Sequence, residues 1–260
     1  MGRRYVDLSV PLENDVPADP PFFKAKITYV DHQASVPEFL AAFPGLTKAE
    51  LPHGEGWALE RVEFVTHHGT HVDAPYHYAS TMNKGERAIT IDEVPLEWFC
   101  QPGVKLDFRH LPDGYVATPS DVEAEFKRIH HELRPLEIIV VNTRAGARYG
   151  SQDYVNSGCG MGRDATLYLL ERGVRVVGTD GWSWDAPFVY TIERYRQTRN
   201  ASIIWEGHRA GKEIGYCQIE KLHDLEKLPS EGFTIVCFPV KIRAASAGWT
   251  RAVAILDDAG

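Results

Sequence analysis

The chain has no long apolar run and no cluster of basic residues. No stretch reaches the roughly 18 apolar residues that a membrane-spanning helix needs, and the opening MGRRYVDLSV lacks the apolar core of a secretory signal. The formal net charge is −8, whereas nucleic-acid binding requires clustered lysine and arginine. We therefore expect no membrane partner, no nucleic-acid partner and no secretion.

Cysteine is scarce, and its spacing excludes a common kind of metal site. The chain has four cysteines and no CxxC pair, which argues against a cysteine zinc knuckle and favours free thiols in a reducing compartment. The cysteines are Cys100, Cys159, Cys217 and Cys237. We expect a cytoplasmic protein.

Internal repeats and low-complexity linkers are also absent. The 260 residues, 43% apolar and 25% charged, have the composition of an ordinary globular protein with a substantial core. We expect one domain over residues 1–260.

Short strand patterns dominate, and helix patterns join them in the second half. The N-terminal quarter is rich in proline and glycine, which predicts long loops around short strands. Strands are predicted at residues 5–10, 25–30, 59–66, 104–108, 137–142, 174–178, 202–205, 233–238 and 252–256. Helices are predicted at 118–133, where Thr118 and Pro119 suit the start, and at 163–172 and 190–199. This mixture indicates an α/β fold with mixed sheets.

The sequence THHGTHVDAPYH holds the densest group of potential metal ligands, at positions 67, 71, 73 and 77. Imidazole and carboxylate groups bind zinc, manganese and iron. His71 and Asp73 are two apart, so on an extended segment they point to the same side. Gly69 permits a turn that would bring His67 back toward them. We predict a metal site built on His67, His71 and Asp73.

Two later residues could complete this site, and one nearby histidine is suited to proton transfer. His208 follows the predicted strand at 202–205, and Glu220 lies in the strand-like YCQIEKL. His77 lies just beyond Pro75, where it could face the site without binding the metal. A reference pKa near 6.5 lets histidine both take and give a proton, so His77 is the predicted general acid/base. The remaining histidines outside the cluster are interpreted as ordinary surface or helix residues: His32, His53, His110, His130, His131 and His223.

Aromatic residues suggest a flat pocket wall. Trp182, Trp184 and Phe188 lie in GWSWDAPF, and aromatic faces suit planar ring substrates. Core packing is the alternative for these three. Phe22, Phe23 and Trp57 could cap a pocket, either of this chain or of a neighbour.

The string HxGTHxDxPxH, from His67 to His77, resembles the signature of the cyclase family of metal-dependent hydrolases, which includes bacterial kynurenine formamidase and isatin hydrolase. The opening Asp7-Leu8-Ser9 and the segment 173–180 are also similar to that family. His208 and Glu220 look like its late ligand pair. The tryptophan-containing stretch after Asp180 looks more like the isatin hydrolase branch.

This resemblance implies a swivelling β/β/α domain with mixed sheets and a homodimeric or homotetrameric assembly. It implies hydrolysis of a cyclic amide, imide or N-formyl amide by a metal-activated water, and a small substrate that is planar and cyclic. It implies one or two divalent ions, zinc or manganese, with Asp73 able to bridge two ions and His77 as acid/base. The implied metal ligands are His67, His71, Asp73, His208 and Glu220.

Other functions remain open at this point. His71, Asp73 and His208 also match the two-histidine, one-carboxylate triad of non-haem iron oxygenases, although His67 and Glu220 would then be surplus. A lactone hydrolase or cyclase of the same family and a non-catalytic, metal-stabilised binding module are further alternatives. The glycine-rich 158–162 is interpreted as a loop, because it lacks a full phosphate-binding pattern.

Overall fold

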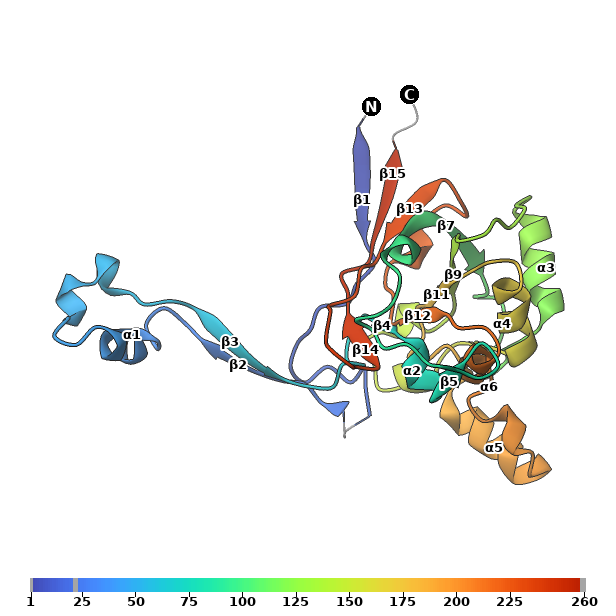
Figure 1. Cartoon of the computed structure of the whole chain (residues 1–260), viewed down its shortest axis with the longest axis horizontal. Coiled ribbons are helices and arrows are strands. Elements are labelled where there is room, and N and C mark those ends of the chain that lie inside the picture. Colours follow the sequence, from blue (N-terminus) through green and yellow to red (C-terminus); the bar gives the residue numbers. More distant parts are fainter. Residues whose placement is uncertain (1, 21–22, 258–260) are drawn as a thin grey trace.

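A nine-stranded mixed sheet forms the centre of the molecule in the computed structural model, which describes residues 2–20 and 23–257 (Figure 1). In spatial order its strands are β1 (Arg3–Asp7), β15 (Val253–Asp257), β13 (Phe233–Val236), β7 (Cys100–Asp107), β9 (Ile138–Asn142), β11 (Val176–Thr179), β12 (Cys217–Glu220), β4 (His71–Asp73) and β14 (Ala247–Trp249). Strands β7, β9, β11 and β12 run parallel, and the other pairings are antiparallel. The predicted α/β class with a mixed sheet is therefore confirmed.

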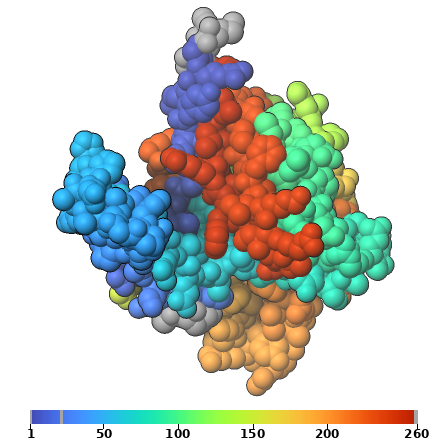
Figure 2. All heavy atoms as spheres, turned by 60° about the vertical axis from the view of Figure 1, so that its left-hand side comes forward, coloured from blue at the N-terminus to red at the C-terminus, as the bar shows by residue number. Residues whose placement is uncertain are grey.

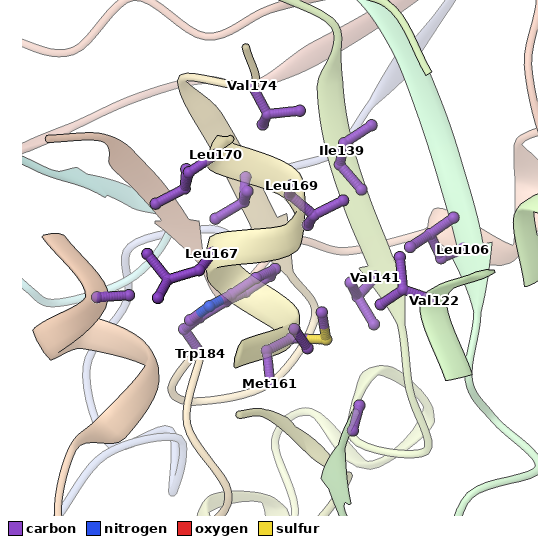
Figure 3. Close-up of a cluster of buried hydrophobic side chains, with 14 of the residues drawn as sticks. Leu106, Val122, Ile139, Val141, Met161, Leu167, Leu169, Leu170, Val174 and Trp184 are labelled. Atoms are coloured by element: carbon purple, nitrogen blue, oxygen red, sulfur yellow. The ribbon is translucent and has the colours of Figure 1, made fainter. Parts of the chain in front are cut away.

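Both faces of this sheet are covered, because its central strands are apolar on both sides. In β9 the residues Ile139 and Val141 face one buried cluster, while Ile138 and Val140 face another, as the alternation of side chains along a strand requires. Helices α3 (Pro119–Arg128) and α4 (Arg163–Leu170) pack on the first face, where the cluster in Figure 3 lies. This core supports the strands of the sheet that carry the candidate site.

The remaining elements are short and surround the main sheet. Three two-stranded pairs join β2 (Lys26–Val30) to β3 (Leu59–Glu63), β5 (Thr81–Met82) to β6 (Glu86–Arg87), and β8 (Val116–Ala117) to β10 (Gly160–Met161). The other helices are α1 (Val36–Ala42), α2 (Pro75–Tyr78), α5 (Phe188–Thr198) and α6 (Glu206–Arg209). Within the described ranges, no helix combines the length and apolar content needed to cross a bilayer.

Most predicted elements agree with the structure within a few residues, but the strand at 202–205 is wrong. Residues 201–203 form a 3-10 turn, in which the Asn200 side chain accepts a hydrogen bond from the backbone N–H of Ser202. Trp205 then takes a left-handed backbone conformation with φ 59° and begins α6. A local side-chain hydrogen bond of this kind competes with extended pairing, and apolar periodicity does not reveal it.

Residues 24–64 form an arm that extends away from the body (Figures 1 and 2). The ribbon of β2 and β3 leads to α1, where Phe39 packs against Phe43 and Trp57 at ring-centroid distances of 5.2 and 4.9 Å. Tyr29 and Val62 on the ribbon are exposed. An isolated two-stranded ribbon is only marginally stable in water, and this one exposes apolar side chains.

Candidate metal centre

Strand register brings the predicted ligands onto one face of the sheet. Strand β4 lies between β12 and β14, with Asp73 opposite Gln218 and His71 opposite Glu220. Residues opposite each other in an antiparallel pair, and residues two apart on one strand, share a face. His71, Asp73, Gln218 and Glu220 therefore lie together in a fully buried part of the sheet.

A turn before β4 returns His67 to the same point. Gly69 has φ 63°, and a Cβ there would lie 2.3 Å from the Leu12 side chain, so the turn requires glycine. The His67 Nδ1 atom is 2.8 Å from Asp73 Oδ1, and His71 Nε2 is 3.3 Å from the same oxygen. The predicted convergence of His67, His71 and Asp73 is present in the structure.

The buried donor atoms suit a cation. The Nδ1 of His71 is 2.8 Å from the carbonyl oxygen of Gly69, which can only accept, so Nδ1 carries the proton and Nε2 presents a lone pair. Within the described chain, the buried Nε2 of His71 has no hydrogen-bond partner, and it faces Asp73 Oδ1 at 3.3 Å. Ligand atoms of His71, Asp73 and Glu220 all lie within 4.8 Å of one another. A divalent cation would satisfy these facing lone pairs.

The pKa values of the two carboxyl groups in the cluster shift in opposite directions. Burial raises the pKa of Glu220 well above its usual value, and the nearby Asp73 carboxylate raises it further. Burial also acts to raise the pKa of Asp73, but electrostatic interactions with the imidazoles of His77, His67 and His71 lower it well below its usual range. A divalent cation would allow both groups to be ionised in the same buried space.

His77 lies at the edge of this cluster, on the short helix α2. Its ring centroid is 4.0 Å from that of His67, and ligand atoms of His67, Asp73 and His77 form a second group within 4.8 Å of one another. Burial lowers the pKa of His77 to about 3, although Asp73 opposes that shift. The imidazole is therefore neutral near pH 7 and can accept a proton.

His208 enters from α6 and is oriented by Asp185. The Nδ1 atom of His208 is 2.5 Å from Asp185 Oδ2, and the backbone N–H groups of Gly207 and His208 donate to the same carboxylate. The other ring nitrogen, Nε2, lies 2.5 Å from Gln218 Nε2 and 3.6 Å from Glu220 Oε1. The structure thus brings His208 and Glu220 together with the residues of β4.

Sequence reasoning missed Gln218 and Asp185. Gln218 Nε2 lies 3.3 Å from Asp73 Oδ2 and 3.2 Å from Glu220 Oε1, in the middle of the cluster. Its position two residues before Glu220 on a strand was an available signal. Asp185 had no comparable signal, because its contact with His208 depends on how α6 docks on the sheet.

A cavity of about 240 Å³ opens beside the cluster. It is lined by Phe23, His67, His77, Trp182, Ser183, Phe188, Trp205, His208, Glu220 and Lys221. The Trp182 and Phe188 rings meet edge to face at 5.6 Å. Two of the three aromatic residues predicted for a pocket wall, Trp182 and Phe188, therefore lie beside the candidate metal centre.

Trp184 does not belong to this cavity, and the prediction that it forms a pocket wall is wrong. Its side chain is 1% exposed and packs in the core below α4, beside Met161 and Leu167 (Figure 3). The indole N–H donates to Thr166 Oγ1 at 3.0 Å. Because its polar atom has a partner inside the core, full burial costs no unpaired hydrogen bond.

The other aromatic residues that were suggested as caps of the pocket have different positions. Phe23 lines the cavity, while Trp57 packs against Phe39 at the end of the arm. Phe22 lies outside the described residues. Trp205, which sequence reasoning assigned to a strand, instead stacks on His208 with ring centroids 4.4 Å apart and lies 5.0 Å from the His77 ring.

A buried lysine ties the N-terminal segment to the cavity. Lys221 is 1% exposed, and its ammonium group donates to Asp19 and, at 3.0 Å, to the backbone oxygen of His67. Asp19 also accepts from the Trp182 indole N–H at 2.9 Å and lies 3.0 Å from His68 Nδ1. The pair thereby holds Trp182 and the start of the histidine turn in place.

Comparison with known proteins gives a family match and several structural likenesses. A family model named Cyclase, described as "Putative cyclase", matches residues 6–186. An isatin hydrolase bound to the product analogue thioisatinate is similar at 20% identity and a TM-score of 0.76, over 98% of this chain and 93% of that chain. Isatin hydrolase A from Labrenzia aggregata, bound to benzyl benzoate, is similar at 23% identity and a TM-score of 0.74, over 98% and 94%. A structure titled as a potential metal-dependent hydrolase with cyclase activity has 20% identity and a TM-score of 0.65, over 99% and 100%. These likenesses show a shared fold.

Proposed function

Because the chain belongs to the cyclase family, we propose that it is a metal-dependent hydrolase that cleaves an amide-type C–N bond in a cyclic amide, imide or N-formyl amide. The observation that carries the proposal is the buried meeting of His71 Nε2 and Asp73 Oδ1, 3.3 Å apart, with Glu220 Oε2 3.7 Å from the same nitrogen. These three potential ligand atoms converge in a buried part of the sheet.

The residues that would hold the ion are His67, His71, Asp73, His208 and Glu220. A divalent cation at this position, zinc or manganese, would polarise a substrate carbonyl and lower the pKa of a bound water molecule. Gln218 lies between the two strand carboxylates and His208, where its amide N–H groups can donate to Asp73 Oδ2 and Glu220 Oε1 and its Nε2 contacts His208 Nε2. Asp185 fixes the tautomer and orientation of His208.

Proton transfer is assigned to His77. Attack of water on an amide carbonyl releases a proton, and the departing nitrogen needs one. The neutral imidazole of His77 lines the cavity and lies against His67, so it can accept the first proton and deliver it to the nitrogen. The low pKa that burial produces keeps His77 unprotonated before the reaction.

The shape of the cavity supports a small planar substrate. Trp182, Phe188 and Trp205 contribute three aromatic rings to a space of about 240 Å³. Aromatic faces bind flat rings well. A protein of similar fold, an isatin hydrolase, is bound to the product analogue thioisatinate, which supports a small-molecule substrate here.

Metal reconstitution and a substrate panel test the proposal. We expect chelator-treated protein to lose activity toward cyclic imides, isatins or N-formyl anilines, and zinc or manganese to restore it. Product formation, elemental analysis and oxygen uptake would be measured together. Oxygen consumption that requires iron would favour the oxygenase alternative. Hydrolysis of lactones alone would show that the enzyme cleaves a C–O bond rather than a C–N bond. A metal-loaded protein that hydrolyses no member of the panel would contradict the enzyme assignment.

We also infer that the chain assembles as a homodimer or homotetramer through the arm at residues 24–64. The exposed residues of the ribbon include Tyr29 and Val62, and the tip adds Phe43 and Trp57. Burying such apolar surface against a second copy would stabilise an element that is marginal alone.

Substituting Val62 with aspartate is expected to shift the protein toward monomers, because a charge would have to be buried at the interface. Val62 is 54% exposed, so the substitution leaves the core intact. Leu96→Asp, at a site on the body that is 68% exposed, is the matched control. Sedimentation equilibrium would measure the association. A wild-type chain that stays monomeric at micromolar concentration would overturn the inference.

The cysteines support a cytoplasmic location for this enzyme. All four are free thiols, and Cys159, Cys217 and Cys237 are buried. Unpaired cysteines are typical of proteins in reducing compartments.

A further inference from the structure

A second cavity, of about 190 Å³, adjoins the cavity of the candidate metal centre. It lies between α5 and the segment that leads into α6, and both cavities share Phe188 and Trp205 as lining residues. Ile192, Tyr195 and Ile204 supply most of its remaining apolar wall. We call this second cavity the α5 groove. The α5 groove therefore adjoins the reaction pocket at these two aromatic side chains.

The α5 groove offers no free charge to a ligand. Asp185 is the one charged residue among the described residues that line it. The carboxylate of Asp185 is already engaged by the backbone N–H groups of Gly207 and His208 and by His208 Nδ1. The chemistry of the α5 groove therefore favours an apolar group over an ion or a sugar.

Trp205 forms part of the wall of both spaces. Its backbone φ of 59° is rare for a bulky residue and is maintained only where the surroundings impose it. Its indole ring stacks on His208 at an interplanar angle of 14°. Because His208 is itself held by Asp185, the position of Trp205 is coupled to the metal centre.

We propose that the substrate carries an apolar substituent, aryl or short alkyl, which occupies the α5 groove while its reacting carbonyl lies at the metal centre. This inference rests on the proposed hydrolase function and specifies its substrate class. The size of the α5 groove, on the order of six water molecules in volume, fits one ring or a short chain. Ile192 and Ile204, although partly exposed, become specificity residues on this assignment.

A series of formanilides with hydrogen, methyl, ethyl or butyl at the para position tests the proposal. In the wild-type enzyme, kcat/KM is expected to rise about three- to fourfold for each methylene that the α5 groove buries. Ile192→Asp should reduce kcat/KM for the butyl compound at least about tenfold and leave unsubstituted formanilide within about twofold. Val189→Asp is the matched control, because Val189 lies on the same helix, is also 48% exposed and lies outside the lining residues. The same dependence on chain length in wild type and Ile192→Asp would overturn the proposal.

Binding of the para-alkylanilines by calorimetry supplies a readout that needs no turnover. The affinity should increase and the heat-capacity change should become more negative with chain length, in wild type and Val189→Asp but not in Ile192→Asp. If this trend appears while no formanilide is hydrolysed, the assignment of the α5 groove to an apolar substituent is supported and the proposed reaction is contradicted. If formanilides are hydrolysed without any chain-length trend, the α5 groove assignment fails alone. An Ile192→Asp variant that changes oligomeric state instead would assign the α5 groove to a second copy and overturn the proposal.

Discussion

Replacing Asp73 with asparagine is expected to remove most metal binding and to lower kcat/KM by at least about 10³-fold, equivalent to about 4 kcal/mol. Asp73 is the residue on which the cluster converges: Oδ1 lies 2.8 Å from His67 Nδ1 and 3.3 Å from His71 Nε2. Asparagine keeps the shape and the place in β4 but loses the charge, so the loss should exceed the roughly 10- to 100-fold typical of a residue that only supports a ligand.

Stability should fall together with activity in the metal-free protein. The neighbouring histidines hold the pKa of the buried Asp73 well below its usual range, so the folded state favours the ionised carboxylate, which contributes to stability near neutral pH. We therefore expect metal-free Asp73→Asn to unfold at a lower temperature than metal-free wild type, and to gain less from added metal. Asp92→Asn, a surface carboxylate bonded to Thr90 and the backbone of Ala244, is the control. Full metal content in purified Asp73→Asn, measured by elemental analysis, would show that the centre is built on other residues.

The part of the site that could be predicted from sequence is the part that local geometry determines. His71 and Asp73 share a face because they are two residues apart on a strand, and Gly69 supplies the turn that returns His67. The candidate ligands His208 and Glu220 were predicted by residue type and by resemblance, since nothing local shows that β12 pairs with β4. Asp19 and Lys221 were missed for the same reason: their contact joins residues 202 positions apart.

The same division applies to the fold. Strands with continuous apolar runs, such as β9, were predictable because both faces are buried. Strand β14 has three residues and no pattern that distinguishes it from a loop, so its place beside β4 follows only from tertiary pairing. The two tryptophans of GWSWDAPF look equivalent in sequence, yet Trp182 lines the cavity and Trp184 fills the core. Burial depends on how α4 packs, which periodicity does not report.

Replacing His77 with alanine is expected to leave the metal bound and to lower kcat by roughly 10²- to 10⁴-fold, the range typical for loss of a general acid/base. Added imidazole should restore part of the rate, because the substitution leaves room beside His67 and Trp205. His110→Ala is the control. Because His110 is an exposed histidine on the body, this variant should retain full activity. Elemental analysis must accompany the kinetics, since His67, Asp73 and His77 also form a potential ligand group.

The metal-free proteins provide a second readout, whose sign follows from the pKa of His77. Burial lowers that pKa to about 3 in the folded state, against a reference value near 6.5 in the unfolded chain. Between these values the unfolded chain binds more protons at His77, so folded wild type should lose stability as the pH falls from about 6.5 toward 3. His77→Ala lacks this contribution, and its stability should fall less steeply over the same range than that of wild type or His110→Ala.

Metal content and imidazole rescue together decide what His77 does. A proton-transfer group acts through an exchangeable base, so alanine should spare the metal and imidazole should replace the missing function. A ligand acts through its place in the coordination shell, so alanine would lower metal content and added metal, rather than imidazole, would restore the rate. The placement of His77 on α2, after the proline that begins this helix and outside the β4 register that aligns His71 with Glu220, favours the first outcome. If His77→Ala is purified with little metal and excess zinc or manganese restores its activity, His77 is a metal ligand. Another group in the cavity would then have to transfer the proton.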